Sequence, residues 1–233
     1  MRVLMRFTKE GNLRWISHLD TMRTLEKAFR RAHVAVTTSQ GFNPHPRFSI
    51  AVPLAVGIAS FGEYLEADCA TLTTPPQIAR DLREQLPAHM NVLYACEIPQ
   101  KAPSLAAIVQ VSRFSLTLPG HDVSFWEDAC HNLLLKPNLN VWRNQGTANE
   151  KCIDIRSGLI TLQVLFHEDI IHLEATIETS SRLYLRLQEL LDLITMNADY
   201  SRLLLADTDP LRLDMGVREE NNFCSLEQYF QWL

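Results

Sequence analysis

The order of hydrophobic periodicities in the first hundred residues restricts the fold more than any other feature. Val3, Met5 and Phe7 alternate with Arg2 and Arg6, as in a strand with one face on a core. Helices are expected at 17–32 and 75–86, and strands at 1–7, 34–36, 48–52, 64–69 and 91–98. With one strand more than the four of that motif, this order corresponds to the β-α-β-β-α-β order of a ferredoxin-like unit.

The first of these helices has a clear start and two distinct faces. Ser17, followed three residues later by Asp20, forms a capping-box-like N-terminus. We expect a buried stripe consisting of Leu19, Met22, Leu25, Ala28, Phe29 and Ala32. The opposite face carries Arg23, Lys27, Arg30 and Arg31.

The same order recurs more faintly after residues 99–107, which are expected to form a linker. Strands are expected at 109–118, 152–156, 158–166, 170–178 and 211–217, and helices at 123–135 and 180–196. We therefore predict an α+β protein of two tandem ferredoxin-like halves with antiparallel sheets, residues 1–100 and 108–233. Aromatic residues of the acidic tail are expected to pack back on the body: Phe223, Tyr229, Phe230 and Trp232.

Composition predicts a cytoplasmic protein with no membrane partner. The longest apolar run, 50–61, contains Pro53 and Gly57 and is too short to cross a bilayer. The basic, strand-like N-terminus lacks the apolar stretch of a signal peptide. The five cysteines are scattered without C-x-x-C spacing, so we expect reduced thiols and neither a metal site nor a cluster held by this chain.

Charge is divided unevenly along the chain. The net charge is −5, but residues 1–50 sum to +6 and the remainder to −11. This asymmetry favours an anionic partner for the N-terminal part, such as RNA or a phosphorylated ligand, whereas a solvated helix face would explain the helical cations alone. The basic residues concerned are Arg2, Arg6, Lys9, Arg14, Arg23, Lys27, Arg30, Arg31 and Arg47.

The segment 40–47 is the first candidate binding element. A glycine and two prolines restrict its backbone, and its polar side chains favour a rigid ligand-binding loop over a turn that only caps neighbouring backbone. Phe42 would stack on a base or anchor the loop. The candidate binding residues are Gln40, Gly41, Phe42, Asn43, His45 and Arg47.

The junction 14–20 is the second candidate element. A helix N-terminus and Arg14 suit a phosphate or carboxylate, and Ser17 and Asp20 join them as candidate binding residues. His18 is the candidate general acid or base because imidazole titrates near neutrality, although a histidine at a helix start also has structural uses. Arg23, Lys27 and Arg30 are expected to contact phosphates.

A third pair, Asp154 and Arg156, is expected on the outward side of one strand. The two residues would form either a surface ion pair or a wall of a cleft facing the first half.

Several long runs resemble one bacterial family, the radical SAM-linked proteins. They are 6–20 (RFTKEGNLRWISHLD), 39–50 (SQGFNPHPRFSI), 53–57 (PLAVG), 101–105 (KAPSL) and 154–156 (DIR). Two positions depart from the family: His45 stands where arginine is expected, and Ser157 where proline is expected. The resemblance implies a functional set of Arg14, Ser17, His18, Asp20, Gln40, Gly41, Asn43, Pro44 and Arg47.

The resemblance implies association with a cobalamin-binding radical SAM protein, beside which members are encoded or to which they are fused. The chain lacks C-x-x-x-C-x-x-C, so cobalamin, SAM and the Fe–S cluster are expected only in that partner. We therefore expect an accessory protein that binds RNA or a substrate, without catalysis of its own, with the N-terminus of the first helix facing the loop 40–47. The alternatives are a metal-independent endoribonuclease using His18 and a scaffold that docks the partner.

Overall fold

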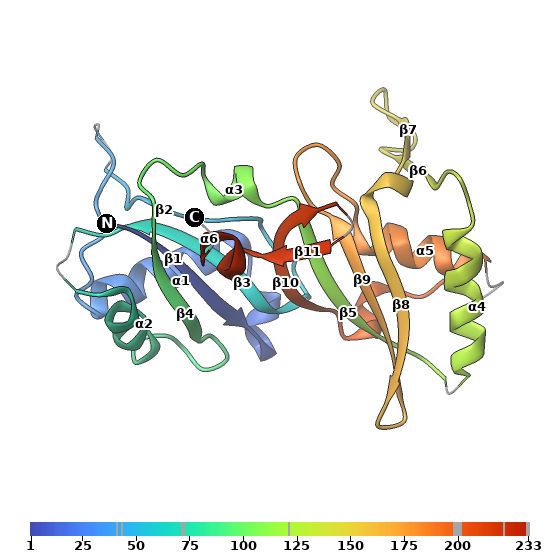
Figure 1. Cartoon of the computed structure of the whole chain (residues 1–233), viewed down its shortest axis with the longest axis horizontal. Helices are drawn as coiled ribbons and strands as arrows, with labels where there is room; N and C mark the ends of the chain where they lie inside the picture. Colours follow the sequence, from blue (N-terminus) through green and yellow to red (C-terminus); the bar gives the residue numbers. More distant parts are fainter. Residues whose placement is uncertain are drawn as a thin grey trace. The chain divides into compact units, whose positions relative to one another are not determined.

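The computed structural model describes residues 1–40, 42, 44–70, 73–120, 122–197, 202–220 and 222–231. Within these residues the protein is α+β, with a nine-stranded mixed sheet and a separate two-stranded hairpin (Figure 1). Two compact units divide the chain. The first unit contains 1–109, 212–217 and 224–233, and the second contains 110–211 and 218–223. No helix among the described residues is both long and apolar enough to cross a membrane.

The first unit is built around β1 (Arg2–Lys9), which pairs antiparallel with β3 (Ala59–Asp68) and β4 (Val92–Ile98). The short strand β2 (Phe48–Ile50) pairs with the outer side of β3. The unit also contains η1 (Gly11–Trp15), α1 (His18–Arg31), α2 (Pro75–Arg83) and α3 (Leu105–Ile108). Three later elements also contribute to this unit, β10 with its central part, β11 with its second half and α6 as a whole: β10 (Leu211–Glu219), β11 (Asn222–Ser225) and α6 (Leu226–Gln231).

Both faces of β1 are buried, whereas the alternation predicted a single core face. Val3, Met5 and Phe7 pack with α1 and α2 in one cluster. Leu4 belongs to a second cluster on the other face, with residues of α3, β10 and α6. Residues of the tail that were expected to pack back on the body do so at Tyr229 and Phe230. Trp232 lies outside the described residues.

The start of α1 agrees with the prediction, but its buried stripe does not include the first turn. Ser17 Oγ accepts a hydrogen bond from the Asp20 backbone nitrogen at 3.1 Å. Leu25, Ala28 and Phe29 are buried, while Leu19 is 65% exposed. Contact with the core begins only at Thr21, so the expected burial of Leu19 is wrong.

The segment expected as a linker is fixed to the sheet. Arg2 donates to the carbonyl oxygens of Ala102 and Pro103, the latter at 2.9 Å. Leu105, the first residue of α3, is fully buried. Residues 99–107 are therefore a packed part of the first unit and not a free connection.

The second unit pairs β5 (Val111–Leu118) antiparallel with β9 (Ile170–Glu178), and β9 with β8 (Leu159–His167). Its helices are α4 (Val123–Leu134) and α5 (Leu187–Asn197), with η2 (Arg156–Gly158) and η3 (Leu205–Thr208). The hairpin of β6 (Asn140–Arg143) and β7 (Lys151–Asp154) was not expected. In the whole sheet the strand order is β4-β1-β3-β10-β5-β9-β8.

Three predicted elements differ from the structure for local reasons. The strand at 34–36 is only an isolated bridge between Val36 and Cys69. The strand expected at 152–156 ends at Asp154, because a 3₁₀ turn follows. The helix expected at 180–196 begins only at Leu187, since Thr179 and Tyr184 form a bridge before it.

Candidate functional site

The basic side chains of the first fifty residues fall into two groups. Five of them have contacts inside the first unit: Arg2, Arg6, Lys9, Arg14 and Arg47. The other four lie exposed on the outer face of α1, although Arg23 also pairs with Asp20 and Arg31 also donates to the Gln85 carbonyl oxygen: Arg23, Lys27, Arg30 and Arg31. The exposed positive charge of residues 1–50 therefore lies mainly on one face of α1.

Lys9 shows why a basic residue in this segment is not necessarily a ligand contact. Its side chain is buried, and its Nζ donates to the carbonyl oxygen of Ile16 at 3.1 Å. Burial lowers the pKa of Lys9, and the Arg212 charge acts in the same direction while Glu63 opposes it. Lys9 thus serves to hold the chain after η1.

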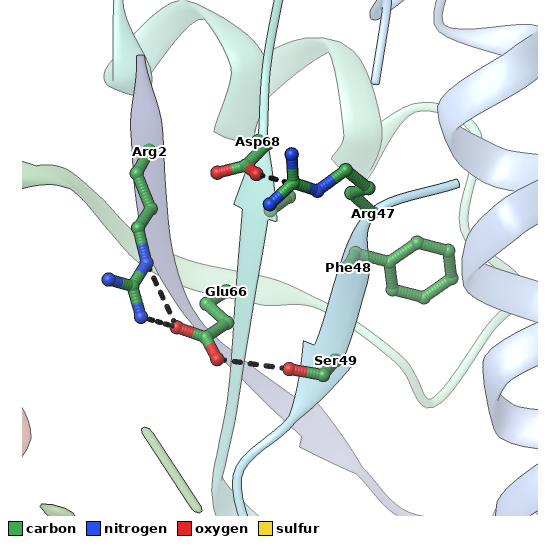
Figure 2. A pocket seen from close by; sticks show the side chains of 7 residues that line it. Arg2, Arg47, Phe48, Ser49, Glu66 and Asp68 are labelled. Carbon is green, nitrogen blue, oxygen red and sulfur yellow. Dashed lines mark hydrogen bonds and ion pairs between the residues drawn. The ribbon is translucent and has the colours of Figure 1, made fainter. Parts of the chain in front are cut away.

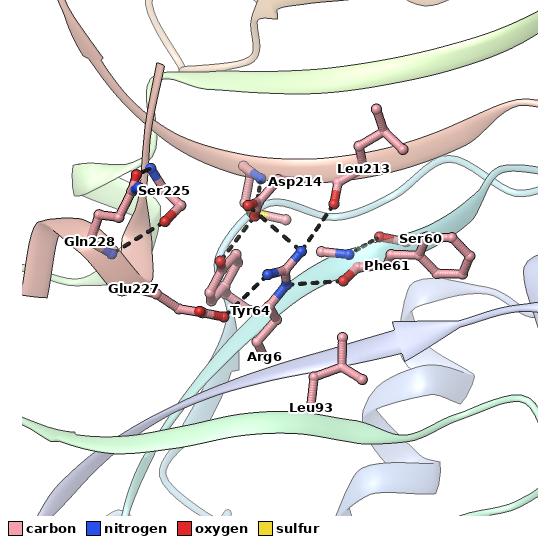
Figure 3. A network of polar contacts seen from close by, with 12 residues as sticks. Arg6, Ser60, Phe61, Tyr64, Leu93, Leu213, Asp214, Ser225, Glu227 and Gln228 are labelled. Atoms are coloured by element: carbon pink, nitrogen blue, oxygen red, sulfur yellow. Dashed lines mark hydrogen bonds and ion pairs between the residues drawn. The ribbon is translucent and has the colours of Figure 1, made fainter. Parts of the chain in front are cut away.

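Arg6 lies at the centre of a polar network in the first unit (Figure 3). It donates to the carbonyl oxygen of Phe61 at 3.0 Å and pairs with Glu227 of α6 at 3.3 Å. Its second acidic neighbour is Asp214 of β10 at 3.7 Å, whose Oδ1 accepts the Tyr64 hydroxyl at 2.9 Å. Burial raises the pKa values of Tyr64 and Asp214. The network attaches the C-terminal segment to the unit.

Two of the exposed cations of α1, Lys27 and Arg31, line a groove of about 390 Å³. Because α1 and α2 pack in one core cluster, they cover the same face of the sheet. Arg80 and Arg83 of α2 are exposed too. They were not among the predicted binding residues, although their spacing of three places both on one side of a helix. The groove lining includes Leu13, Ile16, Asp20, Thr24, Lys27, Arg31 and residues 85–87.

A second hollow, of about 430 Å³, shares Leu86 and Pro87 with this groove. Glu10, Arg83 and His89 contribute its ionisable side chains. Together α1 and α2 carry six basic and three acidic side chains, so the helical face of the first unit has an excess of positive charge.

The loop leading to Arg47 borders a separate hollow of about 300 Å³ (Figure 2). Arg47 Nε lies 3.2 Å from Asp68 Oδ2, and its side chain is 61% exposed. Glu66 is already engaged, because it pairs with Arg2 and accepts the Ser49 hydroxyl at 3.0 Å. Arg47 is thus the most accessible cation of this hollow among the described residues.

The loop itself is held by short-range hydrogen bonds. The His45 backbone nitrogen donates to Ser39 Oγ at 3.0 Å, and the Ser39 nitrogen donates to the His45 carbonyl oxygen at 2.8 Å. Gln40 is exposed and Phe42 is fully exposed. Gly41 and Asn43 were expected to bind ligand, and they lie outside the described residues.

The two candidate elements do not face each other. Arg47 pairs with Asp68, which lies opposite Arg2 in the sheet. The other element lies at the far end of β1, where Lys9 holds Ile16. Seven residues of strand separate the two ends, which is about 23 Å. The expected convergence is wrong, because α1 runs back along β1 before the loop begins.

His18 and Asp20 have different surroundings. His18 is half-buried as the first residue of α1, and among the described residues it has no hydrogen-bonded carboxylate to orient it. The pKa of Asp20 is lowered by the Ser17 hydroxyl and by Arg23. Asp20 is therefore an ionised capping residue, and the role of His18 stays a prediction.

Asp154 and Arg156 satisfy backbone groups. Asp154 Oδ1 accepts the backbone nitrogens of Leu139 and Arg156 at 2.8 and 2.9 Å, which lowers the pKa of Asp154. Arg156 donates to the carbonyl oxygens of Leu134 and Lys136 at the end of α4. This matches the preference of helix C-termini for cations. Across the described part of the chain, no three His, Cys, Asp or Glu side chains are grouped to hold a metal ion.

The structure defines the class of protein, and comparison with known proteins identifies the family. The class is an α+β protein whose first unit has a basic helical face. The chain belongs to a family of uncharacterized proteins conserved in bacteria (DUF2344), whose model matches residues 2–187.

Other comparisons add little. No curated protein matches the sequence significantly. The crystal structure of an unknown protein from Galdieria sulphuraria is similar over 94% of this chain and 98% of that chain, at 9% identity and a TM-score of 0.25. A likeness at that TM-score carries no argument about fold or function.

Proposed function

We propose that this protein is an accessory RNA-binding protein that acts with a cobalamin-binding radical SAM enzyme in RNA modification or processing. The observation that carries the RNA-binding part is the exposed face of α1 and α2, with its six basic and three acidic side chains. Such a face attracts RNA phosphates whatever the base sequence of the RNA, and the groove beside it offers room for ribose and base edges.

The proposed partner rests on the sequence runs that resemble the radical SAM-linked family. Two of these runs meet in the first unit, since Arg14 Nε donates to the Gly57 carbonyl oxygen at 2.9 Å. A third, 101–105, is attached to the sheet by Arg2. Because these runs are held together in the first unit, we expect this unit to bind both the RNA and the radical SAM partner. A cytoplasmic location belongs to the same proposal.

The finer fold assignment is also a proposal: each half of the nine-stranded sheet has a ferredoxin-like arrangement. Support comes from the strand order β4-β1-β3-β2 in the first unit and from the order β10-β5-β9-β8 in the rest of the sheet. In both, two helices connect the strands as the β-α-β-β-α-β order requires.

The test is RNA binding measured by fluorescence anisotropy at several salt concentrations. Lys27→Gln with Arg30→Gln removes two exposed charges of α1 and is expected to make the slope of log affinity against log salt shallower by about 1.4 for single-stranded RNA. The matched control, Lys151→Gln with Arg182→Gln, removes two exposed charges of the second unit and leaves that slope unchanged. Wild-type affinity that is absent or independent of salt contradicts the proposal.

A second candidate function, docking of the radical SAM protein by the loop 40–47, is favoured by one observation. Phe42 is fully exposed, and an exposed aromatic side chain is a common anchor of protein interfaces. Phe42→Ser is expected to weaken binding of the purified radical SAM protein, whereas Leu204→Ser, at another exposed apolar position, is not. Equal binding by wild type and Phe42→Ser argues against this loop as the contact.

A further inference from the structure

Trp15 is an exposed aromatic side chain in a fixed position. It ends η1, and 55% of its surface is exposed. The backbone of Gly57, with φ +93°, lies against the ring, since a Cβ there would be 3.0 Å from Trp15 Cζ3. The Gly57 nitrogen donates to the Arg14 carbonyl oxygen at 2.8 Å, which ties the two segments together. The indole is therefore presented by backbone contacts and not by a mobile loop.

The neighbours of Trp15 combine apolar surface with positive charge. The Arg14 guanidinium carbon lies 5.3 Å from the indole centroid, in a cation–π arrangement. Leu19, in the first turn of α1, is 65% exposed, and Val56, next to Gly57, is 56% exposed. Arg23 follows Leu19 by one further helical turn and is 69% exposed. A flat ring is thus followed along α1 by the cations that carry the proposed function.

This combination selects among possible occupants. A purely apolar partner would take the charged groups of Arg14 and Arg23 out of water and offer no polar contact in return, and a duplex presents phosphates but no free base face. An unpaired nucleotide satisfies both requirements, because its base stacks on an aromatic ring while the adjacent phosphates meet the cations.

Building on the RNA-binding function proposed above, we infer that Trp15 is a stacking platform for an unpaired base, so that the substrate class is single-stranded RNA. The base stacks on the exposed surface of the indole. Leu19 and Val56 border the base, and Arg23 meets the phosphate on the α1 side.

The test compares the full-length Trp15→Ala variant with wild type for binding of a short unstructured RNA and of a duplex of the same length. Loss of one stacked base is expected to weaken single-strand binding roughly 5- to 150-fold, with duplex binding unchanged. Trp15→Phe retains most of the affinity. The matched control is Trp142→Ala, since Trp142 is 57% exposed and lies in the second unit.

The salt dependence separates this inference from the function on which it rests. Stacking involves no counterion release, so Trp15→Ala is expected to keep the wild-type salt slope, whereas the Lys27 and Arg30 variant does not. If that charge variant loses RNA affinity while Trp15→Ala binds as wild type, the platform is refuted and the RNA-binding function stands. Equal loss of single-strand and duplex binding in Trp15→Ala also refutes it, as does Trp15-dependent binding to anionic lipid vesicles without binding to RNA.

Discussion

Arg212 on β10 and Glu63 on β3 form an ion pair with only 1% and 3% of their side chains exposed. Arg212 Nε donates to Glu63 Oε1 at 2.9 Å, and its Nη2 donates to the Val52 carbonyl oxygen at 3.1 Å. Two residues 149 positions apart are thereby fixed inside the first unit. The pair specifies where β10 lies on β3.

Removing one partner of this pair leaves an uncompensated buried charge. We expect Arg212→Ala to lower the free energy of unfolding by about 3–5 kcal/mol. The double variant Arg212→Met with Glu63→Leu is expected to lose less than Arg212→Ala alone, because neither charge of the pair is left behind without the other. Denaturant titration followed by circular dichroism measures both. Arg23→Ala serves as a control, since the pair of Arg23 with Asp20 is exposed and is expected to contribute less than about 1 kcal/mol.

Gly216 allows the close approach of β10 and β11. A Cβ at this position would lie 1.9 Å from the carbonyl oxygen of Cys224, which is backbone and cannot rotate away. Gly216→Ala is expected to cost about 3 kcal/mol and to speed amide hydrogen exchange in β11 and α6. Gly120→Ala adds a Cβ that meets nothing within 4 Å, so it reports only the strain of its positive φ. Unchanged exchange in β11 with Gly216→Ala would contradict the predicted clash.

Arg2 fixes the segment that contains Lys101. Arg2→Met removes the donors to Ala102 and Pro103 and leaves Glu66 without its cation, so residues 99–104 are expected to detach locally. Limited trypsin digestion should then cleave after Lys101 about ten-fold faster, if opening is favoured by about 1.4 kcal/mol. Cleavage after Lys151, in the other unit, provides the internal reference and is expected to stay constant.

Asp214 makes stability depend on pH. Burial raises its pKa, although Arg6 and the Tyr64 hydroxyl act against the shift. The folded protein therefore binds a proton at higher pH than the unfolded chain does. The stabilising contribution is complete below the unfolded pKa of about 3.9 and is lost as pH rises through the raised folded value.

Asp214→Asn is neutral at every pH and keeps an oxygen that accepts the Tyr64 hydroxyl. The free energy of unfolding of Asp214→Asn, relative to that of the wild type, is therefore expected to be higher at about pH 7 than at about pH 4. Denaturant titrations across that pH range measure this difference. A wild-type advantage that grows as pH rises would contradict the assignment.

Local sequence patterns were sufficient for elements whose determinants are close in the chain. The Ser17 cap and the stripe of Leu25, Ala28 and Phe29 both depend on residues within one helix. The hairpin of β8 and β9 was also expected, since its turn and both alternating strands are contiguous.

Determinants distant in sequence could not be predicted in this way. The sequence around Arg2 does not indicate that it pairs with Glu66, 64 positions later. Likewise, the sequence around Arg6 does not indicate its pair with Glu227, 221 positions later. The helix α6 is short and depends on burial of Leu226 in the first unit, so local propensity is a poor guide to it. The same limitation made Arg47 and the start of α1 look like one site.

The division of the first unit between distant stretches of chain has a consequence for biosynthesis. Residues 110–211 separate its first part, 1–109, from the later parts 212–217 and 224–233, so a growing chain presents β3 long before β10 exists to pair with it. At a translation rate of about 5–20 residues per second, that interval is on the order of 10 seconds. During it, Glu63 has no Arg212, and the apolar face that α6 later covers is open to water. During this interval, chaperones or a second nascent chain compete with the protein's own C-terminal segment for the uncovered apolar face.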